Sequence, residues 1–258
     1  GLRWHNHICR YRLQGSNMSL LTTSNPKTQK GVKLGYLTAI QHFAPSTLSG
    51  SNVCDFATPQ CIRFCLNKAG RGGIIKAGEH TNAIQLARIA RTKMFLDDQF
   101  VYMGQLFKEL ASHKRKASKL DLVPCVRLNG TSDIRWEEVM SSVFWRFEDV
   151  QFYDYTKDFV RMQRFLTNRW PTKNYHLTFS RSELNDDQCD WVIDHGGNVA
   201  VVFDDVPDGY KGLEVINGDD SDLRFLDVSK DIFKRGVYIG LTAKGKLKQF
   251  ESAFKVML

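Results

Sequence analysis

The sequence predicts an α/β fold, most simply a (β/α) barrel or partial barrel with parallel strands. From residue 122 onward, short apolar runs typical of strands alternate with segments of helical spacing, which indicates βαβ units. The expected strands are almost continuously apolar, as in sheets that are covered on both faces. Polar residues follow these strands at one end, where parallel α/β folds bind their ligands. A flat, doubly wound sheet is the alternative arrangement.

The elements follow one another along the chain without an internal repeat. The first strand is expected at 33–42, before a loop rich in glycine and serine at 49–53. Apolar side chains at helical spacing in 78–112 predict two helices that separate near Asp97 and Asp98. Later strands are expected at 122–129, 150–155, 174–180, 198–204, 213–217 and 237–241, with helices near 136–146, 158–168 and 183–194. No linker is evident, so residues 18–258 are expected to form a single domain.

The composition is that of an ordinary globular protein, with 42% hydrophobic and 25% charged residues in a chain of 258. This length is sufficient to bury a sizeable core. No run of about 18 apolar residues occurs, so the sequence predicts no membrane-spanning helix and no membrane partner. Residues 1–17 are basic and aromatic and lack the apolar centre of a signal peptide. We expect them to be an expression leader before a natural start at Met18.

The cysteines indicate a reducing compartment. Five remain after the expected leader, and an odd number without a secretory signal argues against a disulfide framework. We therefore expect a cytoplasmic protein. Cys125 is expected to be a small buried side chain, and Cys189 to pack within a helix.

Three cysteines lie close together in a metal-binding segment that we place at 50–73. They are Cys54, Cys61 and Cys65, with the spacing Cx6Cx3C. Thiolates are soft ligands that select iron–sulfur clusters or zinc over magnesium or calcium. We expect an iron–sulfur cluster, [4Fe–4S], because the paired short spacings of zinc sites are missing. A structural zinc and a set of metal-free buried thiols are the alternatives. Candidates for a fourth ligand are His42, His80 and Asp55.

A helix over 58–70 would bring two of these thiols together. Thr58 is a suitable N-cap, and Pro59 suits the first turn. Cys61 and Cys65 are four residues apart, so they would then lie on one helical face.

Polar residues at the strand ends are candidates for holding a cofactor and a substrate. Asn129-Gly130 breaks a strand, and the exposed amides of such a turn can bind an anion or a carboxylate. Plain helix capping by Ser132 or Asp133, with Arg127 paired to a carboxylate, is the alternative. The expected cofactor-binding residues are Arg127, Asn129, Gly130, Ser132, Asp133 and Ser180. The expected catalytic residues, which would orient a polar substrate or transfer protons, are Asp154, Lys157 and Glu183.

The net charge of +8 includes three arginines of the expected leader, so the remaining excess is modest. Lys157, Arg161 and Arg164 share one helical face. We expect this face to be a basic surface for a nucleotide or a nucleic acid.

Several strings of residues resemble a phage-encoded family called gene product 88. They include SNPKTQKG, SGSNVCDFATPQCIRFCLNKAGRG, RLNGTSDIRWE and GLTAKGK, and the resemblance extends from about residue 24 to residue 248. It implies a viral origin and a place in the host cytosol, and it implies no particular reaction.

More distantly, three cysteines ahead of a (β/α) barrel resemble the radical S-adenosylmethionine enzymes. Those enzymes hold a [4Fe–4S] cluster by three cysteines and leave one iron open for S-adenosylmethionine. Their usual spacing is CxxxCxxC, whereas this chain has Cx6Cx3C. The resemblance implies an enzyme, and the basic face indicates a nucleotide or nucleic acid substrate. The alternative is a non-catalytic protein that binds nucleic acid or a host protein and contains a structural zinc or iron–sulfur site.

Overall fold

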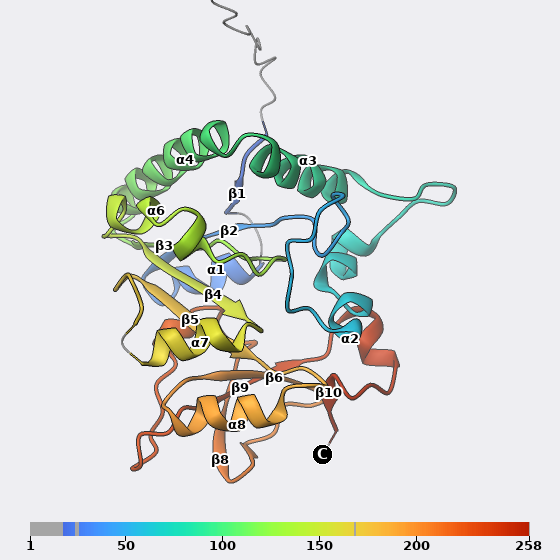
Figure 1. The fold of residues 1–258 in the computed structure, drawn as a ribbon, viewed down its shortest axis with the longest axis vertical. Helices are drawn as coiled ribbons and strands as arrows, with labels where there is room; N and C mark the ends of the chain where they lie inside the picture. Colours follow the sequence, from blue (N-terminus) through green and yellow to red (C-terminus); the bar gives the residue numbers. More distant parts are fainter. Residues whose placement is uncertain (1–17, 24–25, 168, 258) are drawn as a thin grey trace, which may run out of the picture.

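The computed structural model describes residues 18–257 except 24, 25 and 168, so the expected leader at 1–17 lies outside the described residues. The strands are β1 (Leu21–Thr22), β2 (Tyr36–Gln41), β3 (Val123–Arg127), β4 (Gln151–Thr156), β5 (Tyr175–Ser180), β6 (Val199–Phe203), β7 (Gly209–Tyr210), β8 (Leu213–Asn217), β9 (Tyr238–Thr242) and β10 (Lys255–Val256). They form one ten-stranded sheet in the order β1-β2-β3-β4-β5-β6-β9-β8-β7, with β10 beside β6 (Figure 1).

The predicted α/β class is confirmed. Strands β2 to β6, β9 and β8 run parallel to their neighbours, and only β1 and β7 pair in antiparallel fashion. The order of β2 to β6 in the sheet is their order along the chain, as in a (β/α) barrel. Within the described residues the edge strands β1 and β7 do not pair with each other, so the barrel is partial.

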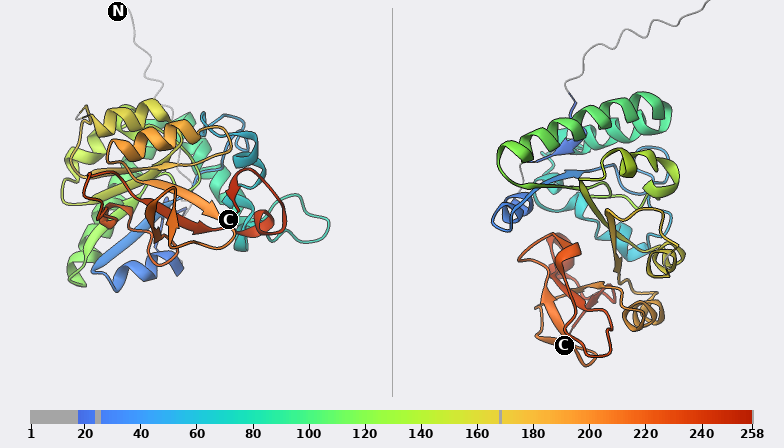
Figure 2. Two further views of the ribbon diagram at one scale, coloured as in Figure 1. Left: turned by 90° about the horizontal axis from the view of Figure 1, so that it is seen from below. Right: turned by 90° about the vertical axis from the view of Figure 1, so that its left-hand side faces the viewer.

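The helices are α1 (Pro26–Val32), α2 (Pro59–Arg63), α3 (Ala83–Asp97), α4 (Gln99–Lys119), α5 (Trp136–Val139), α6 (Ser142–Arg146), α7 (Phe159–Leu166) and α8 (Asp186–Asp194). Helices α4, α7 and α8 contribute Leu106, Met162 and Val192 to one apolar core on the same face of the sheet. Helices α7 and α8 lie side by side on that face (Figure 2). The short helix α1 lies on the opposite face, where Gly31 approaches Thr38 and Leu223.

All the predicted strands are present, although the predicted helices need correction in places. The two helices of 78–112 separate at Asp98, whose side chain accepts a hydrogen bond from the Val101 amide and so caps α4. The single helix expected at 136–146 is two short helices that are interrupted at Met140 and Ser141. The helix expected from residue 183 begins only at Asp186. The short elements β1, α1, β7 and β10 were not predicted.

The two faces of the sheet are covered differently. On the helix-covered face, which we call the outer face, alternate strand residues such as Val126, Leu177 and Val201 are fully buried. On the opposite, inner face, the segment 221–227 packs against the sheet, and Leu223 contacts Cys125 and Tyr153. Cys125 is buried as expected, and Cys189 is buried in α8. No helix in the described part of the chain is long and apolar enough to cross a membrane.

Candidate functional site

A cavity of about 340 Å³ lies at the carboxyl ends of the parallel strands, where ligands bind in folds of this kind. The ends of β3, β4, β5, β6 and β9 form one side of it, and the cysteine segment forms the other. Its size suits one small molecule. The predicted site residues that line it are Cys54, Cys61, Cys65, Arg127, Asn129, Ser132, Asp133, Lys157 and Ser180. Gly130, Asp154 and Glu183 lie outside the lining.

The predicted helix over 58–70 is only partly correct. It begins as expected, because Pro59 is its first residue and the Thr58 hydroxyl accepts a hydrogen bond from the Cys61 amide at 3.3 Å. However, α2 ends at Arg63, and Cys65 has an extended backbone with φ −53° and ψ 136°. The prediction that Cys61 and Cys65 lie on one helical face is therefore wrong. The two thiols still line the same cavity, because the chain turns after α2.

Glu183 holds the cysteine segment to the end of β5. One carboxylate oxygen accepts from the Thr58 hydroxyl at 2.8 Å, and the other accepts from the Gln60 amide at 3.1 Å. This places a negative charge at the first turn of α2, where free amides and the helix dipole favour it. The segment is also fixed before α2, since the Asp133 amide donates to the Val53 carbonyl at 2.8 Å. Glu183 thus has a structural role in this fold.

The three thiols are free and half-buried. The Cys54 sulfur accepts a hydrogen bond from the Ser46 amide at 3.3 Å, and burial raises the pKa of Cys54 to about 12. Burial also raises the pKa of Cys65, which nearby Arg88 and Lys157 oppose. Among the described residues, no group of three or more Cys, His, Asp or Glu side chains has the geometry of a metal site. The predicted metal centre therefore stays a prediction that rests on the donor set.

None of the candidates for a fourth ligand lines the cavity. Burial and the neighbouring Arg88 and Arg127 lower the pKa of His42 to about 3, which keeps its imidazole neutral. Asp55 accepts a hydrogen bond from the Asn52 side chain at 2.9 Å, and His80 is exposed.

Asn129 organises the loop that follows β3. Its side-chain oxygen accepts three hydrogen bonds, from the Ser132 hydroxyl at 2.8 Å, the Ile134 amide at 3.0 Å and the Trp136 indole at 3.1 Å. Ser132 therefore donates to Asn129, and its hydroxyl does not cap a helix. A side chain at Gly130 would place its Cβ 2.4 Å from the Gln41 carbonyl oxygen, so only glycine fits where this loop crosses β2.

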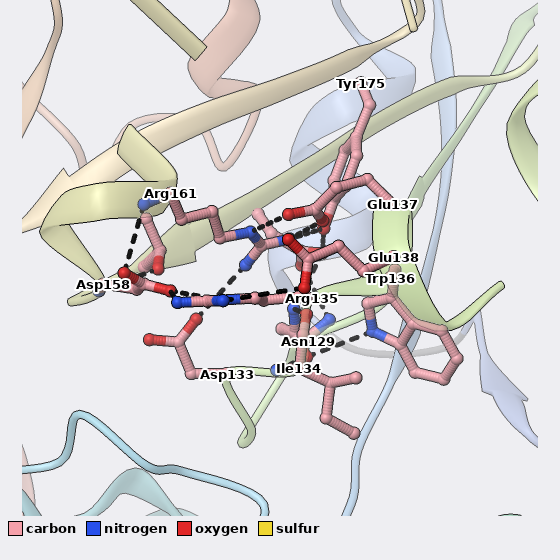
Figure 3. Close-up of polar contacts among 12 residues, drawn as sticks. Asn129, Asp133, Ile134, Arg135, Trp136, Glu137, Glu138, Asp158, Arg161 and Tyr175 are labelled. Carbon is pink, nitrogen blue, oxygen red and sulfur yellow. Dashed lines mark hydrogen bonds and ion pairs between the residues drawn. The ribbon is translucent and has the colours of Figure 1, made fainter. Parts of the chain in front are cut away.

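Asp133 connects the cavity to a buried ion-pair network (Figure 3). Its carboxylate accepts from the Lys157 amide at 2.8 Å and from Arg161 at 3.2 Å. Arg161 is fully buried and donates to both oxygens of Glu137, at 2.9 and 2.7 Å. It also donates to the Tyr175 hydroxyl at 2.7 Å. The network fixes Asp133 at the cavity wall.

The predicted basic surface is wrong. Arg161 is inside the protein, Arg164 pairs with Glu138, and Lys157 precedes α7. The helical spacing correctly placed Arg161 and Arg164 on one helix, but that side faces acidic residues of this chain. It does not form a free surface for phosphate groups.

Asp154 lies on the outer face of β4, away from the cavity. Its carboxylate accepts from the Asn129 amide at 2.7 Å and from the Tyr175 hydroxyl at 2.7 Å. Burial raises the pKa of Asp154 to about 7, although the Tyr175 hydrogen bond and Arg127 oppose the shift. Its contacts are those of a residue that positions Asn129.

Four cations line the cavity, and their partners differ. Arg181 forms a bidentate pair with Asp186, at 2.8 and 3.1 Å, and Lys244 contacts Asp219 at 2.5 Å. Arg127 makes a longer contact of 3.4 Å with Asp222. Lys157 forms no ion pair with a carboxylate of the described residues, and its ammonium group lies 5.6 Å from the ring centre of Phe254.

The lining residues that were not predicted as site residues include Tyr155, Arg181 and Lys244. Tyr155 could have been found, because it is two residues before Lys157 at the end of a strand, and alternate residues point to the same face. Arg181 directly follows β5, and Lys244 lies two residues after the end of β9. The ends of the parallel strands were thus a better guide than the helical spacing.

No curated protein and no solved structure is similar enough to this chain to be called a match. The model of one family, described as gene product 88, matches residues 13–254. This match covers most of the chain and includes the cysteine segment, the loop after β3 and the strands β2 to β9. The chain therefore belongs to the gene product 88 family.

Proposed function

We propose that this protein is an iron–sulfur enzyme in which Cys54, Cys61 and Cys65 hold a [4Fe–4S] cluster beside the cavity. The observation that carries the proposal is that three thiols from different local structures line one cavity at the carboxyl ends of a parallel sheet. Cysteines that only fill space in a protein usually lie in the apolar core. Three such residues would not be expected to gather at the polar edge of a parallel sheet.

The residues around the thiols suit this donor set. Soft thiolates favour iron–sulfur clusters and zinc. Three thiolates bring negative charge, and Arg88 and Lys157 lie close enough to Cys65 to offset it. The Asn67 side-chain oxygen accepts a hydrogen bond from Arg88 and so orients the guanidinium group. Within the described residues Arg88, like Lys157, has no carboxylate partner, so its charge is available to the thiolates.

When it is bound, a cluster with three cysteine ligands leaves one iron open for a small molecule, S-adenosylmethionine in our proposal, and supplies one-electron chemistry. The chain itself would position the reactants. Asn129 fixes the loop on one side of the cavity, and Asp133 offers a carboxylate that the Arg161 network holds in place. Phe254 and Leu247 from the end of the chain cover the cavity on another side and restrict water.

The test is metal analysis after anaerobic purification, with iron, sulfide and zinc measured beside an absorption spectrum. We expect about four irons and four sulfides per chain in the wild type and their loss in Cys61→Ala. Cys189→Ala is the matched control, because that buried thiol lies in α8 outside the cavity, and it should keep the metal content. S-adenosylmethionine titration would follow.

Other outcomes count against the proposal. One zinc and no iron, lost in Cys61→Ala, would indicate a structural zinc site and remove the proposed chemistry. No metal in any of the three proteins, or equal iron in wild type and Cys61→Ala, would contradict the proposal outright.

A further inference from the structure

Two residues of the cavity lining contain buried polar atoms that have no hydrogen-bond partner among the described residues. The Arg127 Nε and the Tyr155 hydroxyl are both buried, and neither has a hydrogen-bond partner among the described residues. Buried polar groups are almost always paired in folded proteins, so two such groups in one cavity lining need an explanation. Both groups can donate a hydrogen bond, so a ligand that pairs with them would have to supply hydrogen-bond acceptors.

These two donors are neighbours. The Arg127 guanidinium lies 4.5 Å from the centre of the Tyr155 ring, and the two residues come from the adjacent strands β3 and β4. Lys157 follows Tyr155 by two residues and lines the same cavity. The guanidinium, hydroxyl and ammonium groups thus belong to three residues that line one cavity.

The charge in this part of the cavity is positive. Asp222 is the carboxylate partner of Arg127, at 3.4 Å, and Lys157 has no carboxylate partner among the described residues. The one acidic residue of the lining, Asp133, is already held by Arg161 and the Lys157 amide. A planar guanidinium together with an ammonium group is well suited to phosphate or carboxylate oxygens.

We propose that Arg127, Tyr155 and Lys157 bind the phosphate or carboxylate group of a small-molecule substrate or cofactor. This inference rests on the proposed function, because it names the class of ligand that the same cavity takes. The remainder of the ligand is expected to be apolar or aromatic, since Val202, Leu241 and Phe254 line the cavity beyond the three donors.

The test uses three small probes and isothermal titration calorimetry on the purified full-length chain. Phenyl phosphate and benzoate carry the two kinds of anion on an aromatic ring, and benzyl alcohol is the neutral control. We expect at least one of the anions to bind at least about tenfold more tightly than benzyl alcohol, as expected for a charge-assisted site. The tighter of the two anions identifies the group that the site prefers.

Variants locate the binding. Lys157→Gln should weaken the anion about tenfold, and Tyr155→Phe should weaken it by about threefold, since it removes one neutral donor. Lys246→Gln is the matched control, because that lysine is exposed and lies outside the lining. Thermal unfolding of each variant checks that it is folded. Unchanged anion affinity in Lys157→Gln, equal affinity for benzyl alcohol, or no binding of either anion would overturn the inference.

The same samples separate this inference from the proposed function. Anion binding in a chain without iron would leave the anion site standing and contradict the cluster. Iron that is lost in Cys61→Ala, together with no binding of either anion, would support the cluster and contradict the anion site.

Discussion

Two buried polar clusters lie on opposite faces of β4 and β5, and they are satisfied to very different degrees. On the outer face, Arg161 bonds to Glu137, Asp133 and Tyr175, and Tyr175 in turn donates to Asp154. On the inner face, several buried polar atoms have no hydrogen-bond partner among the described residues. They belong to Arg127, Tyr155, His176 and Thr178.

The difference in hydrogen bonding follows from the parts of the chain that pack against each face of β4 and β5. Alternate residues of a strand point to opposite faces, so Tyr175 reaches the network under α7, whereas Thr178 points into the barrel. The outer cluster stabilises the fold, because every charge in it has a partner within the chain. In the inner cluster, Arg127 and Tyr155 line the cavity for which we propose an anionic ligand, whereas His176 and Thr178 lie outside its lining. The following experiments test this distinction.

The largest effect is expected from breaking the outer cluster. Arg161→Met removes the cation that, among the described residues, pairs with the buried Glu137, and it also removes one of the hydrogen bonds to the Asp133 carboxylate. We expect the free energy of unfolding to fall by about 3–5 kcal/mol in urea titrations, the usual cost of an uncompensated buried charge. Arg164→Gln, which removes the more exposed pair with Glu138, should cost about 1 kcal/mol or less. A loss below about 1 kcal/mol in Arg161→Met would contradict a stabilising role.

A smaller effect is expected from the pH dependence of Asp154. Burial raises its pKa from 3.8 to about 7 in the folded protein, so the folded state binds a proton more tightly than the unfolded state. Its contribution to stability is present at low pH and is lost as pH rises toward 7. The free energy of unfolding of the wild type, taken relative to Asp154→Asn, should therefore fall by about 2 kcal/mol from pH 5 to pH 7. A difference that stays constant or rises over this range would show that the carboxylate is ionised throughout.

The smallest effects, and the sharpest contrast, come from removing one hydroxyl on each face of β5. Tyr175→Phe leaves both Arg161 and Asp154 short of a partner and should destabilise the protein by about 1–3 kcal/mol. Thr178→Val removes a hydroxyl that is fully buried and unpaired, so it should leave stability unchanged or raise it by about 1 kcal/mol. Equal destabilisation by both substitutions, measured in the same urea titrations, would mean that the two faces do not differ.

Much of the fold could be predicted because the strands carry their own signal. The run 198–204 is apolar on both faces, the run 174–180 alternates apolar and polar residues, and parallel strands place their polar ends at one edge. That rule correctly brought Arg127, Lys157 and Ser180 to the same cavity as the three cysteines. Short pieces such as β1 and β10, of two residues each, have too few side chains to form a recognisable pattern.

The errors came from contacts between distant parts of the chain. Arg161 meets Glu137 and Asp133, which precede it by 24 and 28 residues, so its helical face alone gave no sign of burial. The early end of the helix that was predicted over 58–70 has a local cause instead. Gly72 and Gly73 fold back against the carbonyls of residues 67 and 68 so closely that a Cβ would lie 2.8 and 2.2 Å away, which a continuous helix would prevent. Spacing within the segment could not reveal this fold-back.

The way in which the cysteine segment is held affects the order of events during synthesis. Thr58 is bonded to Glu183, 125 residues later, and Gln60 is contacted by Ser252, 192 residues later. Phe64 packs against Phe250, whose centroid is 6.1 Å away. A ribosome has therefore passed Ser252 before the thiols acquire their final surroundings. Incorporation of any cofactor that they hold follows the synthesis of these late residues, and until then the nascent chain carries three thiols that are still unshielded.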